Sequence, residues 1–180
     1  MCGIFAAATD TAISETLVRN AVGTLAHRGP DGEGIWISPD RRAALGHRRL
    51  SVIAPEDGFQ PLVGEDGRIR AVVNGEFYGF ENLRQKLAGR GHRFSTQSDS
   101  EVAVHLYEDL GLDFVTQLRG EFALVIRDES RHQLVAARDR FGVKPLLYAT
   151  TSDGTFIASE AKALFAAGVE RRWDCESFHR

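Results

Sequence analysis

Cysteine is scarce in this chain, and its two copies, Cys2 and Cys175, stand near opposite ends of the sequence. Two such residues provide neither a disulfide framework nor a zinc-ligand spacing, and their scarcity favours a reducing, cytoplasmic compartment. A basic excess is also absent, since 22 Lys and Arg stand against 25 Asp and Glu. No apolar run approaches the about 18 residues of a membrane-spanning helix, and the N-terminal residues lack the positive stretch of a secretory signal. We therefore expect no nucleic-acid partner and no membrane partner.

The chain has 180 residues, of which 43% are hydrophobic and 26% are charged. This is the composition of an ordinary globular domain. A chain of this length forms one domain by default. No internal repeat or low-complexity stretch interrupts it. The apolar pattern fades near the C-terminus, which predicts a domain over residues 2–167 and a polar tail or linker over residues 168–180.

Strand-like segments cluster apart from helical ones in this sequence instead of alternating with them. Apolar periodicity predicts strands over residues 3–8, 35–38, 44–53, 68–74, 121–127, 133–138, 146–150 and 155–159. It predicts helices over residues 14–26, 80–87 and 160–167, and another after Ser98, which forms a capping-box pattern with Glu101. This order favours antiparallel sheets in an α+β domain.

Cys2 has an unusual position for a structural cysteine. Removal of Met1, which is expected before so small a side chain, leaves a free α-amino group on the residue that carries the thiol. An α-amine has a pKa of about 7.7–8.0, so part of it is neutral at pH 7 and able to act as a base for the thiol. The alternative is a buried, inert cysteine, which is what we expect of Cys175. The six histidines show no metal-ligand spacing.

Several short motifs then follow one another along the chain. They are Cys2-Gly3-Ile4-Phe5, His27-Arg28-Gly29-Pro30-Asp31-Gly32, Gly46-His47-Arg48-Arg49-Leu50-Ser51, Val73-Asn74-Gly75-Glu76, Ser98-Asp99-Ser100-Glu101, Leu118-Arg119-Gly120-Glu121-Phe122-Ala123, the block from Ala137 to Leu146, and Ala158-Ser159-Glu160-Ala161-Lys162-Ala163-Leu164. In this order and spacing the chain resembles the class II glutamine amidotransferase domain. Within that family it is most similar to the N-terminal glutaminase domain of glutamine-hydrolysing asparagine synthetase.

The resemblance implies an N-terminal-nucleophile fold, a four-layer αββα sandwich with two antiparallel sheets. It also implies the substrate, L-glutamine, and its hydrolysis to glutamate and ammonia through a thioester on Cys2. No metal and no organic cofactor is needed for any step of that reaction.

The resemblance further assigns roles to residues around the nucleophile. Asn74 and Gly75 resemble an oxyanion hole, although an Asn-Gly pair alone would read as a type I′ hairpin turn. Arg49 resembles the clamp on the substrate α-carboxylate, with an exposed strand arginine as the alternative. Glu76 and Asp99 resemble the acids that hold the α-ammonium, and Asp99 would also suit the first turn of a helix. The backbone that lines the same pocket is expected in Leu50, Ser51, Val52 and Ile53. The block from Arg138 to Pro145 is expected to order a turn outside the site.

The resemblance also implies a partner. Asparagine synthetases carry an ATP-using domain with a Ser-Gly-Gly-x-Asp-Ser loop, and neither that string nor a P-loop pattern occurs here. We therefore expect an ATP-dependent synthetase domain or partner chain beyond these residues, with the ammonia acceptor left open. Two other functions stay open as well: a free-standing amidohydrolase that acts on other γ-glutamyl compounds, and a catalytically silent interaction domain that keeps Met1.

Overall fold

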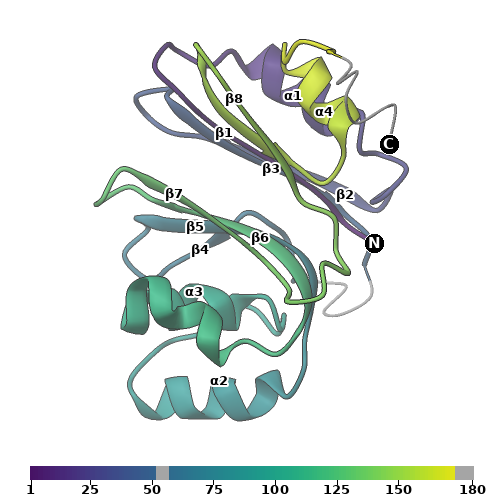
Figure 1. The fold of residues 1–180 in the computed structure, drawn as a ribbon. Coiled ribbons are helices and arrows are strands. Elements are labelled where there is room, and N and C mark those ends of the chain that lie inside the picture. The colour runs from purple at the N-terminus through teal and green to yellow at the C-terminus, as the bar shows by residue number, and fades with distance from the viewer. Residues whose placement is uncertain (52–56, 173–180) are drawn as a thin grey trace.

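Two antiparallel sheets lie face to face at the centre of the molecule (Figure 1). One has five strands in the order β2-β3-β1-β9-β8, with bounds β1 (Gly3–Thr9), β2 (Gly32–Ile37), β3 (Ala43–Arg49), β8 (Leu147–Thr151) and β9 (Gly154–Ala158). The other has four strands in the order β4-β5-β6-β7, with bounds β4 (Leu62–Val63), β5 (Ile69–Phe77), β6 (Gly120–Asp128) and β7 (Gln133–Arg138). The structure is a computed structural model that describes residues 1–51 and 57–172.

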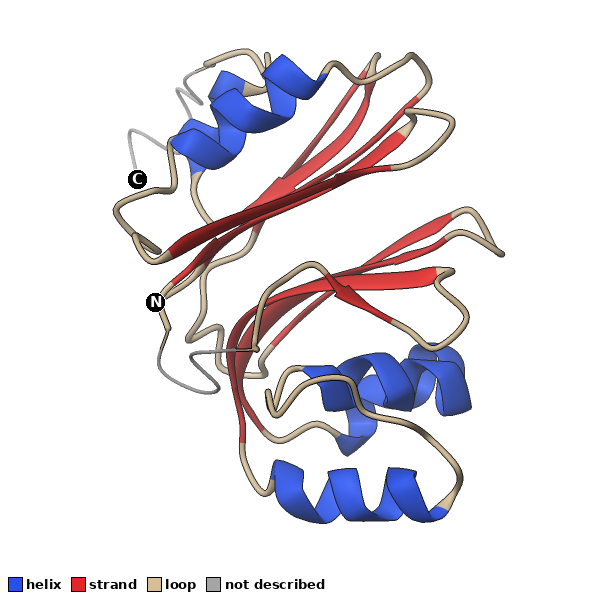
Figure 2. Cartoon of the chain, turned by 180° about the vertical axis from the view of Figure 1, so that it is seen from behind, coloured by secondary structure: helices blue, strands red, loops and turns tan. Residues whose placement is uncertain are grey.

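Helices cover the outer face of each sheet, as the view from behind shows (Figure 2). The five-stranded sheet carries α1 (Glu15–Gly23) and α4 (Ala161–Ala166), and the four-stranded sheet carries α2 (Phe80–Gly89), α3 (Glu101–Leu110) and the 3₁₀ helix η1 (Gly111–Gln117). The expected four-layer αββα sandwich is therefore confirmed. None of the helices in the described ranges has the length and apolar character that crossing a lipid bilayer requires.

Three apolar clusters hold these layers together. Strand β1 contributes side chains to two of them, which is why its sequence is apolar throughout. Phe5 and Ala7 pack with α1 and α4, whereas Ile4 and Ala6 pack between the two sheets against residues such as Val72. Alternate side chains of a strand point to opposite faces, so a strand buried on both faces reads as one continuous apolar run. A third cluster lies between the four-stranded sheet and α2, α3 and η1.

The predicted elements are present, with differences at their ends. The helix that was predicted over residues 14–26 ends at Gly23, because the residues that follow form turns. The strand that was predicted from residue 35 begins earlier, at Gly32. β3 ends at Arg49, whereas the prediction ran to residue 53, and residues 52–56 lie outside the described range. Two elements were not predicted, β4 and η1, since a two-residue strand and a short 3₁₀ turn leave little periodicity.

Two local predictions are wrong. The strand that was expected to stop before Gly75 continues to Phe77, because β6 pairs with it along its whole length. The capping box is also absent: Ser100 takes the N-cap position and makes no side-chain cap bond. The carboxylate of Glu101 instead accepts hydrogen bonds from the backbone and hydroxyl groups of Ser95 and Thr96, and thereby ties down the preceding loop.

Candidate active site

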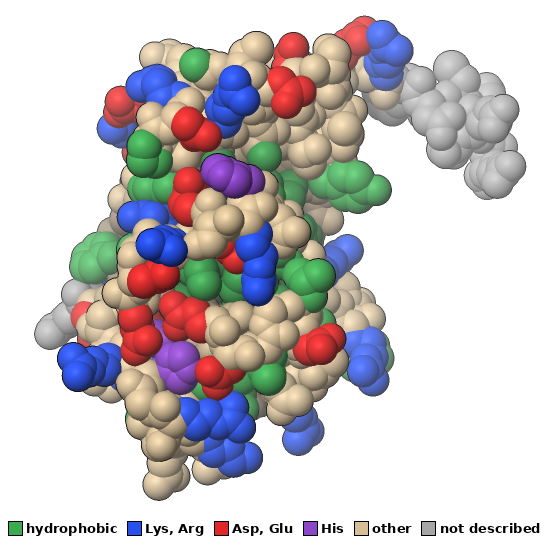
Figure 3. Space-filling model, turned by 90° about the vertical axis from the view of Figure 1, so that its left-hand side faces the viewer, with side chains coloured by type: hydrophobic (Ala, Val, Ile, Leu, Met, Phe, Trp, Pro, Cys, Tyr) green, Lys and Arg blue, Asp and Glu red, His purple; other side chains and the backbone are tan. Residues whose placement is uncertain are grey.

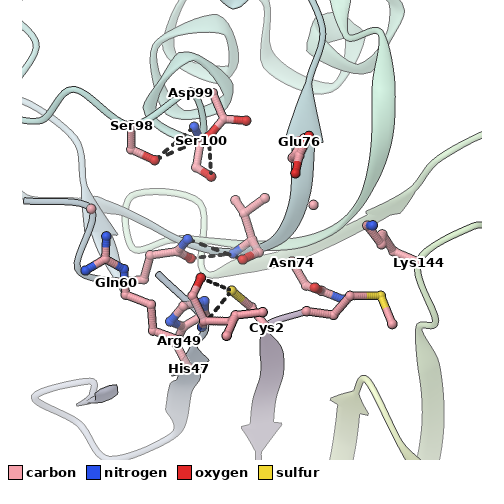
Figure 4. A pocket seen from close by; sticks show the side chains of 15 residues that line it. Cys2, His47, Arg49, Gln60, Asn74, Glu76, Ser98, Asp99, Ser100 and Lys144 are labelled. Atoms are coloured by element: carbon pink, nitrogen blue, oxygen red, sulfur yellow. Dashed lines mark hydrogen bonds between the residues drawn. The ribbon is translucent and has the colours of Figure 1, made fainter. Parts of the chain in front are cut away.

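A polar pocket of about 170 Å³ opens where the two sheets meet near the start of the chain (Figure 4). It brings together residues from β3, β5, the loop before α3 and the residues that precede β1. Its lining consists of Met1, Cys2, His47, Arg49, Leu50, Gly58, Gln60, Val73, Asn74, Gly75, Glu76, Ser98, Asp99, Ser100 and Lys144. Most of the residues that the sequence motifs singled out therefore converge on one cavity, although they are scattered over a hundred positions of the chain.

Cys2 lies in this pocket with its thiol held against the segment that follows β3. The backbone N–H of Leu50 donates to the Cys2 sulfur at 3.4 Å, and the sulfur lies 3.8 Å from the Leu50 carbonyl oxygen. This contact fixes where the sulfur points.

Arg28, to which the sequence assigned no role, anchors the backbone of Cys2. Its Nε donates to the Cys2 carbonyl oxygen at 2.9 Å, and its Nη1 pairs with Glu160 Oε1 at 2.9 Å. Burial disfavours the charged form of Glu160, but the hydrogen bonds from Arg28, Lys162 and His27 outweigh this effect and lower the pKa of Glu160 to about 2. Arg28 therefore holds the start of β1 and the start of α4 in fixed positions relative to each other.

Asn74 and Gly75 lie within β5, opposite Ala123 and Phe122 of β6. The hairpin-turn alternative for this pair is therefore wrong. A side chain at Gly75 has no room, because its Cβ would stand 2.2 Å from the carbonyl oxygen of Glu121. Glycine is required here by the close approach of the two strands.

The side chain of Asn74 is buried, at 1% exposure, and faces the pocket (Figure 4). Its Nδ2 makes no hydrogen bond to any described residue. Buried polar atoms are nearly always paired, so an unpaired amide donor in a polar cavity indicates a group that a ligand satisfies. The acceptor that suits it is an oxygen atom carrying partial or full negative charge.

Arg49 ends β3 and is 5% exposed, so the alternative of an exposed strand arginine is wrong. Its guanidinium lies 5.0 Å from the centre of the Phe59 ring, a contact that keeps the planar group in place. Arg48, its neighbour on the opposite face of the strand, pairs with Glu33 at 2.7 Å. A guanidinium fixed in a cavity is suited to bind a carboxylate through two parallel hydrogen bonds.

The segment after Arg49 is only partly described. Leu50 lines the pocket. The N–H of Ser51 donates to Asp31 Oδ2 at 2.8 Å, which fixes the backbone beside the pocket, while Ser51 itself is not among the lining residues. Val52 and Ile53 lie outside the described residues.

Glu76 and Asp99 form an acidic side of the cavity, across from Arg49 and His47 (Figure 4). Asp99 is 3% exposed, and its Oδ2 accepts the N–H of Phe77 at 2.8 Å. Burial raises the pKa of Asp99, and the nearby charge of Glu76 adds to the rise, while the hydrogen bond from Phe77 opposes it. A buried carboxyl group with a raised pKa is stabilised in its charged form by a cationic ligand.

The sequence assigned no role to two further pocket residues, Gln60 and His47, although His47 stands in a quoted motif. His47 is 1% exposed, and burial, with a contribution from the charge of Arg49, lowers its pKa to about 4. The imidazole is therefore neutral at pH 7. Gln60 forms two hydrogen bonds with the backbone of Val73, at 2.6 and 3.2 Å, and so braces β5 next to Asn74.

The block from Arg138 to Pro145 does order a turn, as expected. The carboxylate of Asp139 accepts the backbone N–H groups of Phe141, Val143 and Lys144. Lys144, however, also lines the pocket and pairs with Glu121 at 3.2 Å. The prediction that this whole block lies outside the site is therefore wrong for Lys144. The only sequence signal for Lys144 was its membership of a quoted motif.

Comparisons with known proteins show the family to which the chain belongs. A family model described as a glutamine amidotransferase domain matches residues 1–180. The chain is 42% identical over 96% of its length to a Gibberella zeae protein named Amidase chry2, and 39% identical over 94% of its length to a glutamine-hydrolyzing asparagine synthetase of Bacillus subtilis. It spans only 28% and 27% of the lengths of these two relatives.

The fold has solved counterparts. The glutamine phosphoribosylpyrophosphate amidotransferase of Bacillus subtilis superposes with a TM-score of 0.78 at 24% identity, over 93% of this chain and 44% of that one. The expected N-terminal-nucleophile architecture is thereby confirmed. Family model, relatives and fold agree, and the chain belongs to the family of glutamine amidotransferase domains.

Proposed function

We propose that this chain hydrolyses L-glutamine to glutamate and ammonia, with Cys2 as the nucleophile. The observation that carries the proposal is the convergence, in one cavity, of the Cys2 thiol and the unpaired amide of Asn74. A nucleophile next to an unpaired hydrogen-bond donor is the arrangement that acyl transfer requires, because negative charge develops on the carbonyl oxygen during attack.

The charged groups of the pocket fit the two ends of an amino acid. The α-carboxylate of glutamine would pair with the guanidinium of Arg49, and the α-ammonium would lie against Asp99 and Glu76. The side-chain amide would then extend toward Cys2. Lys144 and His47 line the same cavity, and the neutral imidazole of His47 adds no repulsion toward a cationic amino group.

The chemical steps start with the removal of Met1, whose side chain lines the pocket. The freed α-amine of Cys2 takes the proton of the thiol, and the sulfur attacks the amide carbon. Asn74 Nδ2 and the backbone N–H of Gly75 stabilise the oxyanion of the tetrahedral intermediate. The protonated amine gives its proton to the leaving nitrogen, ammonia departs, and a γ-glutamyl thioester remains. Water then attacks the thioester carbon and gives a proton to the Cys2 amine, the carbon–sulfur bond breaks, the amine returns that proton to the sulfur, and glutamate leaves.

The ammonia is proposed to serve an ATP-dependent synthetase domain, as the similarity to glutamine-hydrolyzing asparagine synthetases suggests, and the acceptor stays open. We propose that residues 168–180 begin the linker to that domain, since the last helix, α4, ends at Ala166. A reducing cytoplasmic compartment suits an enzyme whose nucleophile has to remain a free thiol.

A second candidate is an amidohydrolase that acts on another amide. The Gibberella zeae relative, which is named an amidase, favours keeping it. Arg49, Asp99 and Glu76 would bind the α-carboxylate and α-ammonium groups of any γ-glutamyl compound. The pocket therefore selects the γ-glutamyl group more strongly than the amine that leaves. Rates on glutamine and on a series of γ-glutamyl amides separate the two candidates.

The test uses the full chain, with the loss of Met1 verified by intact mass. Incubation with glutamine is expected to release equal amounts of ammonia and glutamate. The Cys2→Ala variant is expected to lose this activity, whereas the matched Cys175→Ala variant is expected to keep it. Release of ammonia by Cys2→Ala above a few per cent of the parent rate would remove Cys2 from its role, and a silent parent chain with Met1 removed would reject the function.

A further inference from the structure

A second polar cluster lies away from the pocket, where three segments meet beside α3. It consists of Glu65 from the turn after β4, His92 from the loop after α2, and His105 and Glu108 from α3. One nitrogen or oxygen atom of each residue lies within 4.8 Å of the corresponding atoms of the others. Nothing in the sequence pattern indicates this group, because its members come from elements that only the fold brings together.

The distances within the cluster suit a small cation. Glu108 Oε2 lies 2.8 Å from His105 Nδ1 and 3.5 Å from His92 Nδ1, and Glu65 Oε2 lies 3.6 Å from His92 Nδ1. Ligands of a tetrahedral zinc ion, with bonds of about 2.0–2.1 Å, stand roughly 3.4 Å apart. The four atoms thus require only small shifts to surround one ion.

Three of the four side chains are held from behind by a hydrogen bond of their second polar atom, and the fourth, His105, directs its Nε2 toward a carboxylate without bonding it. Glu108 Oε1 accepts the N–H of Glu65, and Glu65 Oε1 accepts the N–H of Arg93. His92 Nε2 pairs with Asp109 at 3.0 Å, and His105 Nε2 faces Glu101 at 3.6 Å. Metal-binding histidines typically direct their other nitrogen to a carboxylate, and metal-binding carboxylates are themselves hydrogen-bonded.

Burial supplies the second argument. His105 is 1% exposed and His92 has a side-chain exposure of 12%, yet His92 Nδ1 makes no hydrogen bond within the described part of the chain. This buried atom points at the two carboxylates. Glu65, at 40% side-chain exposure, leaves an approach from solvent. The face drawn in Figure 3 carries, in its lower half, a histidine among acidic side chains.

The cluster has one other explanation, a protonated histidine in place of an ion. Burial opposes the charge of His105, but the carboxylates of Glu101 and Glu108 outweigh it and raise the pKa of the imidazole to about 9. This accounts for the position of His105. It does not account for His92 Nδ1, which is buried and has no hydrogen-bond partner among the described residues, while Nε2 of the same ring pairs with Asp109.

We propose that Glu65, His92, His105 and Glu108 form a structural zinc site. Two imidazoles and two carboxylates match the ligands that zinc takes, whereas magnesium and calcium prefer oxygen alone. Four protein ligands leave no open position, which is typical of structural sites. The ion would join the β4 turn and the loop after α2 to α3, the helix that begins right after the pocket residues Ser98 to Ser100.

The test uses the full chain with both cysteines changed, Cys2→Ala and Cys175→Ala, so that neither thiol competes for metal. After treatment with a chelator, calorimetric titration with zinc is expected to give one ion per chain and a raised melting temperature. Cobalt is expected to produce the visible absorption of a tetrahedral site. The variants His92→Gln and Glu65→Gln are expected to weaken zinc binding by about 100-fold, and Asp109→Asn, behind His92, by about tenfold.

His132→Gln is the matched control, since His132 is exposed on the turn between β6 and β7. It is expected to bind zinc as tightly as the parent. Glu65→Gln changes a half-exposed residue and keeps the proposal testable if His92→Gln fails to fold. Absence of zinc binding, or equal zinc affinity in Glu65→Gln and His132→Gln, would reject the zinc site. The cluster would then be explained by a protonated histidine alone.

Discussion

Replacing Asn74 with alanine is expected to separate catalysis from stability. In the resting protein the Asn74 amide is buried and its Nδ2 has no hydrogen-bond partner among the described residues. The group therefore contributes little to the folded state, whereas the proposed mechanism gives it its acceptor in the transition state. The change is expected to lower kcat strongly and to leave the melting temperature nearly unchanged.

The magnitudes follow from these contacts. Loss of one oxyanion-hole donor costs about 3–4 kcal/mol in the barrier, or about 10²–10³ in kcat. On the stability side, truncation loses packing, but it also removes an unpaired buried donor that costs roughly 1–3 kcal/mol. These two effects oppose each other, so we expect a net change within about 1 kcal/mol, or about 2–4 °C in Tm.

Gln60→Ala provides the contrasting variant within the same pocket. Gln60 bonds both polar groups of Val73, at 2.6 and 3.2 Å. Its truncation leaves a backbone N–H without a partner, and the free energy of unfolding is expected to fall by roughly 1–3 kcal/mol. Asn74→Ala is thus expected to lose activity and keep stability, while Gln60→Ala is expected to lose stability.

The assay is steady-state ammonia release from glutamine, with thermal unfolding followed by circular dichroism. KM of Asn74→Ala is expected to stay within about threefold of the parent value, because the contact forms chiefly in the transition state. A kcat within tenfold of the parent, or a change confined to KM, would refute the oxyanion assignment. A large drop in melting temperature would refute the interpretation of its unpaired amide.

Two further predictions address the same pocket. Arg49→Lys keeps the charge but loses the planar fork, so KM for glutamine is expected to rise about tenfold or more while kcat changes little; a change in kcat alone would contradict the carboxylate assignment. The pKa of His47 is about 4 in the folded chain and about 6.5 in the unfolded chain. Between these two pH values the unfolded state therefore binds one proton more than the folded state. The free energy of unfolding is expected to fall as pH decreases through this window, by up to about 3 kcal/mol. Urea unfolding at several pH values is expected to show a smaller loss of free energy of unfolding for His47→Gln than for the parent, and the same loss for His132→Gln as for the parent. An equal loss in all three proteins would contradict this prediction.

The order of strands and helices was predictable because local periodicity determines it. The continuous apolar run of β1 is a case in point, since both of its faces are buried. Asn74 and Gly75 show the opposite case. Their sequence alone suits a hairpin turn, and only pairing with β6, nearly fifty residues later, extends the strand through them. Tertiary contacts overrode local preference there.

The site divides in the same way. The resemblance to the family was enough to place Cys2, Arg49 and Asp99 in one pocket. It assigned nothing to His47, although that residue stands in the same motif as Arg49, or to Gln60, because a histidine in a strand and a glutamine in a loop are ordinary until their neighbours are known. The cluster around His92 and His105 was unpredictable for the same reason, since its ligands come from segments separated in the sequence.

The position of β1 has a consequence for biosynthesis. Cys2, the proposed nucleophile, directly precedes β1, yet this strand lies between β3 and β9, and Ile4 exchanges hydrogen bonds with Ser159, 155 residues later. At about 5–20 residues per second, a ribosome needs on the order of 10–30 s to make the intervening chain. Throughout that time β1 lacks one of its neighbours, and Arg28 lacks Glu160. The amine and thiol of Cys2 are thus exposed to modifying enzymes before the pocket that uses them exists.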